Sequence, residues 1–102
     1  MRTVGERIGA IYGSSAGTIE FLGYGVYAGD EVPVTAIGPL AEMCREVACD
    51  NPKLVLDDGS VVWGCECWWG SEESVQQRLA GCDHVVVVKI EDKRQQYREA
   101  KK

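Results

Sequence analysis

The sequence predicts a single α+β domain in which two helices pack on a largely antiparallel sheet, in the order ββαββαβ. Three observations lead to this prediction. Segments with strand-like apolar patterns occur in both halves of the chain. Two other segments carry apolar residues at helical spacing, and an Asp58-Gly59 pair between apolar runs indicates a hairpin. At 102 residues, the chain is long enough for one modest core.

The first two strands are expected over residues 3–12 and 18–27, joined as a hairpin by the small-residue loop 13–17. Gly23 and Gly25 lie inside the second strand. Glycines there indicate a bulge, a bend or the close approach of another backbone. The loop is a weak candidate for a phosphate-binding nest, because it lacks the lysine of a P-loop and does not lead into a helix.

The first helix is expected to begin at Pro39, after a loop over residues 28–38, because proline suits the first helical turn. Apolar residues then recur at i, i+3, i+4 and i+7, and we expect this stripe to face the core. The stripe consists of Leu40, Met43, Cys44 and Val47. The helix should end by Asp50-Asn51-Pro52.

Residues 53–69 carry the strongest local signal, a hairpin with a primed two-residue turn at Asp58-Gly59. Such a turn pairs Leu56 with Val61 and Leu54 with Trp63. If the second strand continues to Trp69, alternate residues share one face, and Glu66 and Trp68 lie on the other. The first of these faces carries Val61, Trp63, Cys65, Cys67 and Trp69.

Ser71 is the predicted N-cap of a second helix that ends at Gly81, with Val75, Leu79 and Cys82 as its apolar anchors. Residues 83–90 are apolar on both faces, which predicts a central strand. The domain is expected to span residues 1–90. Residues 91–102 form a charged tail, predicted to be a weak helix or disordered, so truncation after Asp92 should leave stability nearly unchanged.

The net charge of −5 is unevenly distributed, with −8 in residues 1–88 and +3 in residues 89–102. An acidic body argues against direct nucleic-acid binding. No apolar run approaches the length of a membrane span, and residues 1–10 lack the apolar segment of a secretory signal. The sequence therefore predicts a cytoplasmic protein that does not associate with membranes.

An odd number of cysteines, five, argues against a secreted disulfide scaffold and favours buried, reduced thiols. The alternative is a small zinc-stabilised domain. Its four ligands would be Cys65, Cys67, Cys82 and His84. One residue separates the two members of each pair, Cys65 and Cys67 or Cys82 and His84, which is a shorter spacing than in common zinc knuckles. We therefore favour buried thiols over a zinc site and expect no cofactor.

No catalytic set is evident, because His84 is the only histidine and could pair as a base only with a residue such as Cys82. Of the Asp57-Asp58 pair, Asp58 is explained by the turn and Asp57 by the end of the strand. We therefore predict a protein that is not an enzyme, with a cysteine-dependent enzyme as the least favoured alternative.

Aromatic residues define the predicted binding surface, since five of the eight lie in two short segments. Glu66 should keep its strand face partly solvated, because an unsolvated charge is costly. Trp68 on that face is the expected anchor, while Trp69 belongs to the core. The predicted binding residues are Trp68, Glu66, Tyr24, Tyr27 and Glu72.

The chain resembles a family of small phage- and prophage-associated proteins of unassigned function. The resemblance covers residues 4–90 and depends mainly on the run Trp63-Gly64-Cys65-Glu66-Cys67-Trp68-Trp69-Gly70, with Gly23-Tyr24-Gly25-x-Tyr27-x-Gly29-Asp30 before it. It implies a bacterial host cytoplasm and no established activity. We expect an accessory binding protein that occupies or sequesters a host protein or a small-molecule ligand, in an anti-defence or host-modulating inhibitory role. A homodimer is compatible with this expectation.

Overall fold

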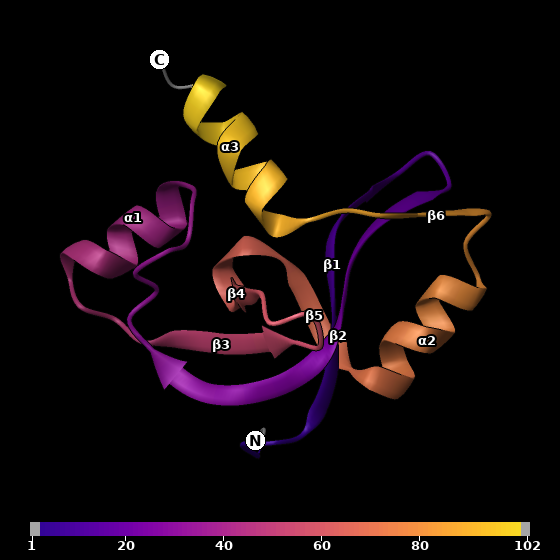
Figure 1. The fold of residues 1–102 in the computed structure, drawn as a ribbon, viewed down its shortest axis with the longest axis horizontal. Helices are drawn as coiled ribbons and strands as arrows, with labels where there is room; N and C mark the ends of the chain where they lie inside the picture. The colour runs from indigo at the N-terminus through magenta and orange to yellow at the C-terminus, as the bar shows by residue number, and fades with distance from the viewer. Residues whose placement is uncertain (1–2, 101–102) are drawn as a thin grey trace.

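Two long strands near the N-terminus organise the fold (Figure 1). In the computed structural model, which describes residues 3–100, β1 (Arg7–Ser15) and β2 (Thr18–Glu31) form an antiparallel hairpin. The two residues between them, Ala16 and Gly17, have φ of 48° and 82°. Positive φ at both positions is the geometry of a primed two-residue turn, which suits the twist of paired strands.

The remaining strands add to both sides of this hairpin. β3 (Asn51–Leu56) pairs with the second half of β2, and β4 (Val61–Trp63) pairs with β3. β5 (Trp68–Ser71) pairs with the free side of β1. All these pairings are antiparallel, and only β6 (His84–Val87) runs parallel to its neighbour, the first part of β2. The predicted α+β class with a largely antiparallel sheet is confirmed.

Three α-helices in the described chain cover the sheet, one more than predicted: α1 (Pro39–Glu46), α2 (Glu72–Ala80) and α3 (Ile90–Ala100). In Figure 1, α2 and α3 lie on opposite sides of the β1–β2 hairpin, and α1 lies beyond the β3–β4 end. α2 approaches β1 so closely that a Cβ atom at Gly9 would lie 2.8 Å from the Val75 side chain. Each of these helices is too short and too polar to span a bilayer.

Apolar residues are buried on both faces of the sheet and in a smaller cluster beside α1. The cluster under α2 contains Ile11, Ile19 and Val75. The cluster beside α1 contains Ala36, Ala41 and Trp63. The largest cluster lies on the α3 face and contains Ile8, Ala10, Leu22, Tyr27, Leu54, Leu56, Val62 and Ile90.

Local signals in the sequence are confirmed at several boundaries. Pro39 begins α1, and the Ser71 hydroxyl accepts a hydrogen bond from the Ser74 N–H at 3.1 Å as the N-cap of α2. Gly81 is the C-cap of α2. Gly25 lies so close to β3 that a Cβ there would lie 2.2 Å from the Val55 carbonyl oxygen, the close backbone approach that the sequence indicates.

The predicted register of the Asp58-Gly59 hairpin is wrong by one residue. Leu54 pairs with Val62 instead of Trp63, and Val55 pairs with Val61. The Gly59 N–H donates to the Leu56 carbonyl at 2.9 Å, and the Leu56 N–H donates to the Ser60 carbonyl at 2.8 Å. These bonds close a three-residue loop with a bulge at Gly59, where φ is +91°. Consequently Val62, and not Trp63, joins the main core.

The last strand and the first helix bury less than predicted. β6 pairs only with β2 among the described strands and is therefore an edge strand rather than a central one, with Val87 69% exposed. In α1, only Ala41 is fully buried, and the apolar stripe faces outward. Its exposed members are Leu40, Met43 and Val47. The helix is instead joined to the loop 33–38, where Arg45 donates to the carbonyls of Pro33 and Ala36.

Residues 91–100, predicted as a weak helix or disordered, belong to the eleven-residue helix α3, in which Ile90 and Arg94 are buried. Ile90 was expected at the end of the last strand and instead begins this helix. Truncation after Asp92 would remove the buried Arg94, so it should lower the stability. This differs from the expectation from the sequence, which was nearly unchanged stability. Lys101 and Lys102, the last residues of the predicted tail, lie outside the described residues.

Gly59→Val should lower the free energy of unfolding by about 2 kcal/mol, because a β-branched residue resists the left-handed region that the loop requires. The matched control is Gly13→Val, since a Cβ atom added at Gly13 would have no neighbour within 4 Å and the φ of Gly13 is not positive. Urea denaturation of both variants measures the difference. Equal stabilities would show that this loop geometry is wrong.

Candidate functional site

The chain between β4 and β5 turns sharply instead of continuing as one strand. Residues Gly64–Glu66 form a 3-10 helix, η1. The Asn51 side-chain oxygen accepts the Cys65 N–H at 2.7 Å, and a Cβ at Gly64 would lie 3.0 Å from the Pro52 ring. These contacts with the start of β3 bend the chain, so the predicted continuous strand 61–69 is wrong.

Because of this bend, Glu66 is 8% exposed and lies inside the protein. This corrects the expectation that Glu66 keeps a strand face wet. Its carboxylate accepts two hydrogen bonds from Arg94 of α3, from Nε at 3.0 Å and from Nη2 at 2.8 Å. It also accepts the backbone N–H groups of Ile37 and Trp63, both at 3.1 Å.

Arg94 is equally well satisfied. Its Nη2 also donates to the Val61 carbonyl at 2.9 Å, and its Nη1 donates to Glu91 one turn earlier in α3. Burial alone would lower the pKa of Arg94, but hydrogen bonds and charges from Glu66 and Glu91 outweigh burial and raise it. The Arg94 guanidinium therefore stays charged, and its bonds with Glu66 join η1, α3 and the loop before α1.

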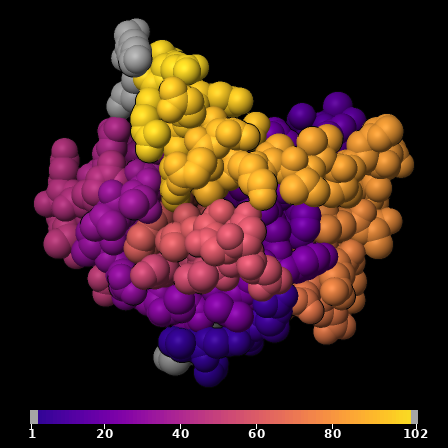
Figure 2. Space-filling view, viewed as in Figure 1, coloured from indigo at the N-terminus to yellow at the C-terminus, as the bar shows by residue number. Residues whose placement is uncertain are grey.

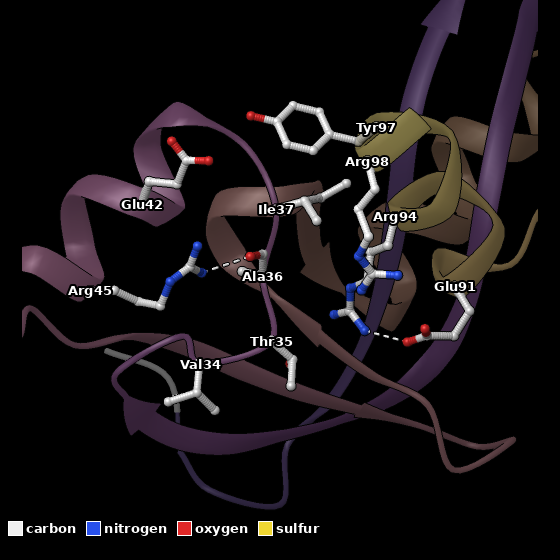
Figure 3. A pocket seen from close by; sticks show the side chains of 10 residues that line it. All are labelled: Val34, Thr35, Ala36, Ile37, Glu42, Arg45, Glu91, Arg94, Tyr97 and Arg98. Atoms are coloured by element: carbon white, nitrogen blue, oxygen red, sulfur yellow. Dashed lines mark hydrogen bonds and ion pairs between the residues drawn. The ribbon is translucent and has the colours of Figure 1, made fainter. Parts of the chain in front are cut away.

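A cleft of about 600 Å³ opens between that loop, α1 and α3 (Figure 3). Figure 2 shows α3 standing beside the α1 region on the surface of the molecule. Arg45 reaches into the cleft from one side and Arg98 from the other, with Ile37 between them. The lining residues are Val34, Thr35, Ala36, Ile37, Glu42, Arg45, Glu91, Arg94, Tyr97 and Arg98.

The two arginines that face each other differ in how they are held. Nη1 of Arg45 donates to the carbonyls of Pro33 at 3.0 Å and Ala36 at 2.7 Å, which fixes the guanidinium against the loop. Arg98 is exposed and, within residues 3–100, makes no hydrogen bond or ion pair. The lining carries three arginines and two glutamates, and Arg94 is already paired with Glu66 and Glu91. Arg45 and Arg98 are therefore the two guanidinium groups of the lining that make no ion pair among the described residues.

Trp68 is exposed and Trp69 packs inward, as the sequence predicted, but Trp68 does not share a surface with Glu66, which is buried. The two tryptophans belong to the separate strand β5. Trp68 is 45% exposed, and the Arg78 guanidinium lies 4.7 Å from its ring centroid. Trp69 packs against the main core and stacks on Tyr27, with ring centroids 5.8 Å apart. Trp68 thus presents an aromatic surface beside α2 and is not one of the residues that line the cleft.

The five predicted binding residues do not form one surface. Tyr27 is buried at 8% exposure and its hydroxyl donates to Asp30 at 2.6 Å, so it is a core residue. Tyr24 and Trp68 lie on the α2 face, because their partners Gly9 and Ile11 face that helix. Glu72 begins α2 and accepts the Arg7 Nε–H at 2.9 Å.

The environment of Tyr24 on the α2 side affects the pKa of its hydroxyl. Burial, with the nearby negative charge of Glu72, raises the pKa of Tyr24 above its usual value. Its ring meets Phe21 edge-on at a centroid distance of 4.9 Å. Tyr24, Glu72 and Trp68 therefore share the α2 side of the molecule, whereas Glu66 and Tyr27 belong to the interior.

The four predicted zinc ligands are not grouped: the three cysteines belong to three different clusters, and His84 is exposed in β6. Cys65 packs beside Trp63, Cys67 packs against the main core, and Cys82 packs under α2. The Cys82 thiol donates to the Gly17 carbonyl at 2.9 Å and to the His84 carbonyl at 3.1 Å. Within residues 3–100, no three histidine, cysteine or acidic side chains are grouped to hold a metal ion.

Burial also governs the chemistry of the cysteines in the Cys-Glu-Cys run. It raises the pKa of Cys67 to about 12, helped by the charge of Glu66. It raises the pKa of Cys65 as well. Since the thiolate is the nucleophile, both thiols are poorly reactive at neutral pH.

Comparison with protein-family models, with curated proteins and with solved structures finds no match to this chain. The site is therefore defined by its geometry.

Sequence reasoning missed the cleft because its two walls are far apart in the chain, at residues 34–45 and 91–98. One signal was present. Arg94 and Arg98 are spaced i, i+4 in a segment of net charge +3, which places both on one face if that segment is helical.

Trp69→Ala should lower the free energy of unfolding by about 3 kcal/mol, because it removes a ring packed in the main core. Trp68→Ala should cost less than about 1 kcal/mol, since that ring is half exposed and contributes mainly its contact with Arg78. Thermal or urea unfolding of the two variants gives the comparison. Equal losses would place both rings in the core.

Proposed function

We propose that this protein is a non-catalytic binding protein that holds a small organic anion in the cleft between the loop 33–38, α1 and α3. The observation that carries the proposal is Arg98, a guanidinium that points into the cleft without a partner among the described residues. A carboxylate or phosphate group of a ligand would supply that partner.

Arg45 supports the choice of an anion. Its two bonds to loop carbonyls use one terminal nitrogen and hold the guanidinium in place. The other terminal nitrogen faces the cleft (Figure 3). A donor already fixed by the protein loses little conformational entropy on binding, so it recognises an anionic group efficiently.

The size and lining of the cleft suit a metabolite-sized ligand. A volume of about 600 Å³ lies within the range of small-molecule sites. Val34, Ile37 and the Tyr97 ring offer apolar surface for the body of such a ligand.

Binding without catalysis is supported by the groups that line the cleft. The lining includes neither histidine nor cysteine among the described residues. The raised pKa of Cys67 argues against a nucleophilic role for that thiol. Together with the resemblance to phage-associated proteins, these features favour sequestration of a host metabolite or signal as the role of the protein.

A protein partner is the second candidate, and the exposure of Trp68 favours it. An aromatic ring 45% exposed beside the exposed Arg78 is typical of a binding anchor. The Trp68→Ala variant, which should remain folded, would lose capture of such a partner from bacterial lysate while keeping the cleft intact.

Arg98→Gln should weaken binding of a co-purified or screened organic anion at least about tenfold, because it removes one charged hydrogen-bonding partner. Its unfolding free energy should change little, since Arg98 has no partner within the described chain. Isothermal titration with nucleoside monophosphates and with citrate provides the assay, after native mass spectrometry of the purified protein identifies any retained anion.

The matched control is Gln96→Ala, an exposed position on the same helix that does not line the cleft. Gln96→Ala should bind as the wild type does. If the wild-type protein binds none of these anions, or if both variants bind alike, the proposed site is wrong.

A further inference from the structure

The edge of the sheet formed by β6 is apolar and open. Val85, Val86 and Val87 are 41%, 49% and 69% exposed. In the space-filling view this segment lies on the surface between α3 and α2 (Figure 2). Valines exposed together on an edge strand are a template for pairing with another strand.

The pairing of β6 with β2 shows which backbone groups remain available. The N–H groups of His84 and Val88 donate to Gly17 and Phe21 of the hairpin. In a parallel ladder the residues that bond to one neighbour alternate, so Val86 also faces β2. The N–H and C=O groups of Val85 and Val87 therefore point away from β2, toward the open edge.

Monomeric proteins usually block such an edge with lysine, proline or a bulge. β6 has none of these within its four residues, His84–Val87. Its charged neighbours, Asp83 and Lys89, stand at the two ends with opposite signs. Along the chain, the segment is therefore acidic, then apolar, then basic. When two such segments run antiparallel, the acidic end of each lies opposite the basic end of the other.

We propose that β6 pairs antiparallel with β6 of a second copy of this chain, about a twofold axis at Val86. This register places Val85 opposite the partner's Val87 and Val87 opposite the partner's Val85. Both residues of each pair direct their backbone groups outward, so the two pairs form four backbone hydrogen bonds. The two sheets then continue across the interface as one.

The same register places Asp83 opposite the partner's Lys89, and Lys89 opposite the partner's Asp83. Asp83 is exposed. Lys89 is also exposed and bonds only at the surface, to Asp58 at 3.1 Å. Opposite charges across a pair of strands stabilise one register, and like charges destabilise it. No other register of β6 on itself gives both the outward backbone pairs and this charge match.

The first test measures the oligomeric state of the full chain by sedimentation equilibrium over a series of concentrations. Val87→Lys should weaken dimerisation at least about tenfold, because lysine on an edge strand opposes pairing. Val4→Lys is the matched control, since Val4 is 67% exposed and lies away from β6. Near-ultraviolet circular dichroism confirms that both variants are folded.

The second test uses the charges. Asp83→Lys and Lys89→Asp should each dimerise about tenfold more weakly alone, and an equimolar mixture should form the heterodimer, because only the mixed pair restores both contacts. A monomeric wild type contradicts the proposal, as do equal effects of Val87→Lys and Val4→Lys, or a mixture that shows no preference for the heterodimer. None of these outcomes bears on the anion cleft, which lies on other elements.

Discussion

The buried ion pair between Glu66 and Arg94 is the interaction on which the other features of this small protein depend. Removing two charges from water is costly, and mutual attraction offsets that cost only when every hydrogen-bonding group is satisfied. Here the Glu66 carboxylate accepts four hydrogen bonds, two from Arg94 and two from backbone N–H groups. Among the described residues, no buried side-chain nitrogen or oxygen is left without a partner.

This pair explains why a strongly polar segment forms an ordered helix against the body of the protein. α3 buries only Ile90 and Arg94, so apolar contacts alone offer it little. Arg94 anchors the helix to η1, and the same carboxylate holds the loop at Ile37. Arg98, one turn after Arg94, is thereby placed across from Arg45, and the proposed anion cleft follows from the ion pair beneath it.

The sequence predicted those features that depend on neighbouring residues. The start of α1 at Pro39, the cap of α2 at Ser71 and the β1–β2 hairpin all follow from local signals. Asp58-Gly59 was ambiguous, because an Asp-Gly pair suits either a two-residue turn or a longer loop with a bulge, and the choice shifts the register by one residue. The exposure of Trp68 was also predicted.

Features that depend on distant residues were not predictable in this way. The turn at Gly64–Glu66 depends on Asn51 and Pro52, and Glu66 meets an arginine 28 residues later. The run of valines in β6 indicates a strand but does not say whether one or two strands flank it. Tertiary contacts decide both points, and they determine which surface carries the cleft.

The central claim is tested most directly by the coupling free energy between Glu66 and Arg94 in a double-mutant cycle. Glu66→Gln, Arg94→Met and the double variant would be compared by urea denaturation. Each single change should cost about 3 kcal/mol or more, since it leaves a buried partner unpaired. The double variant should cost about 2 kcal/mol less than the sum of the two. Additive losses, or single losses below about 1 kcal/mol, would contradict this account.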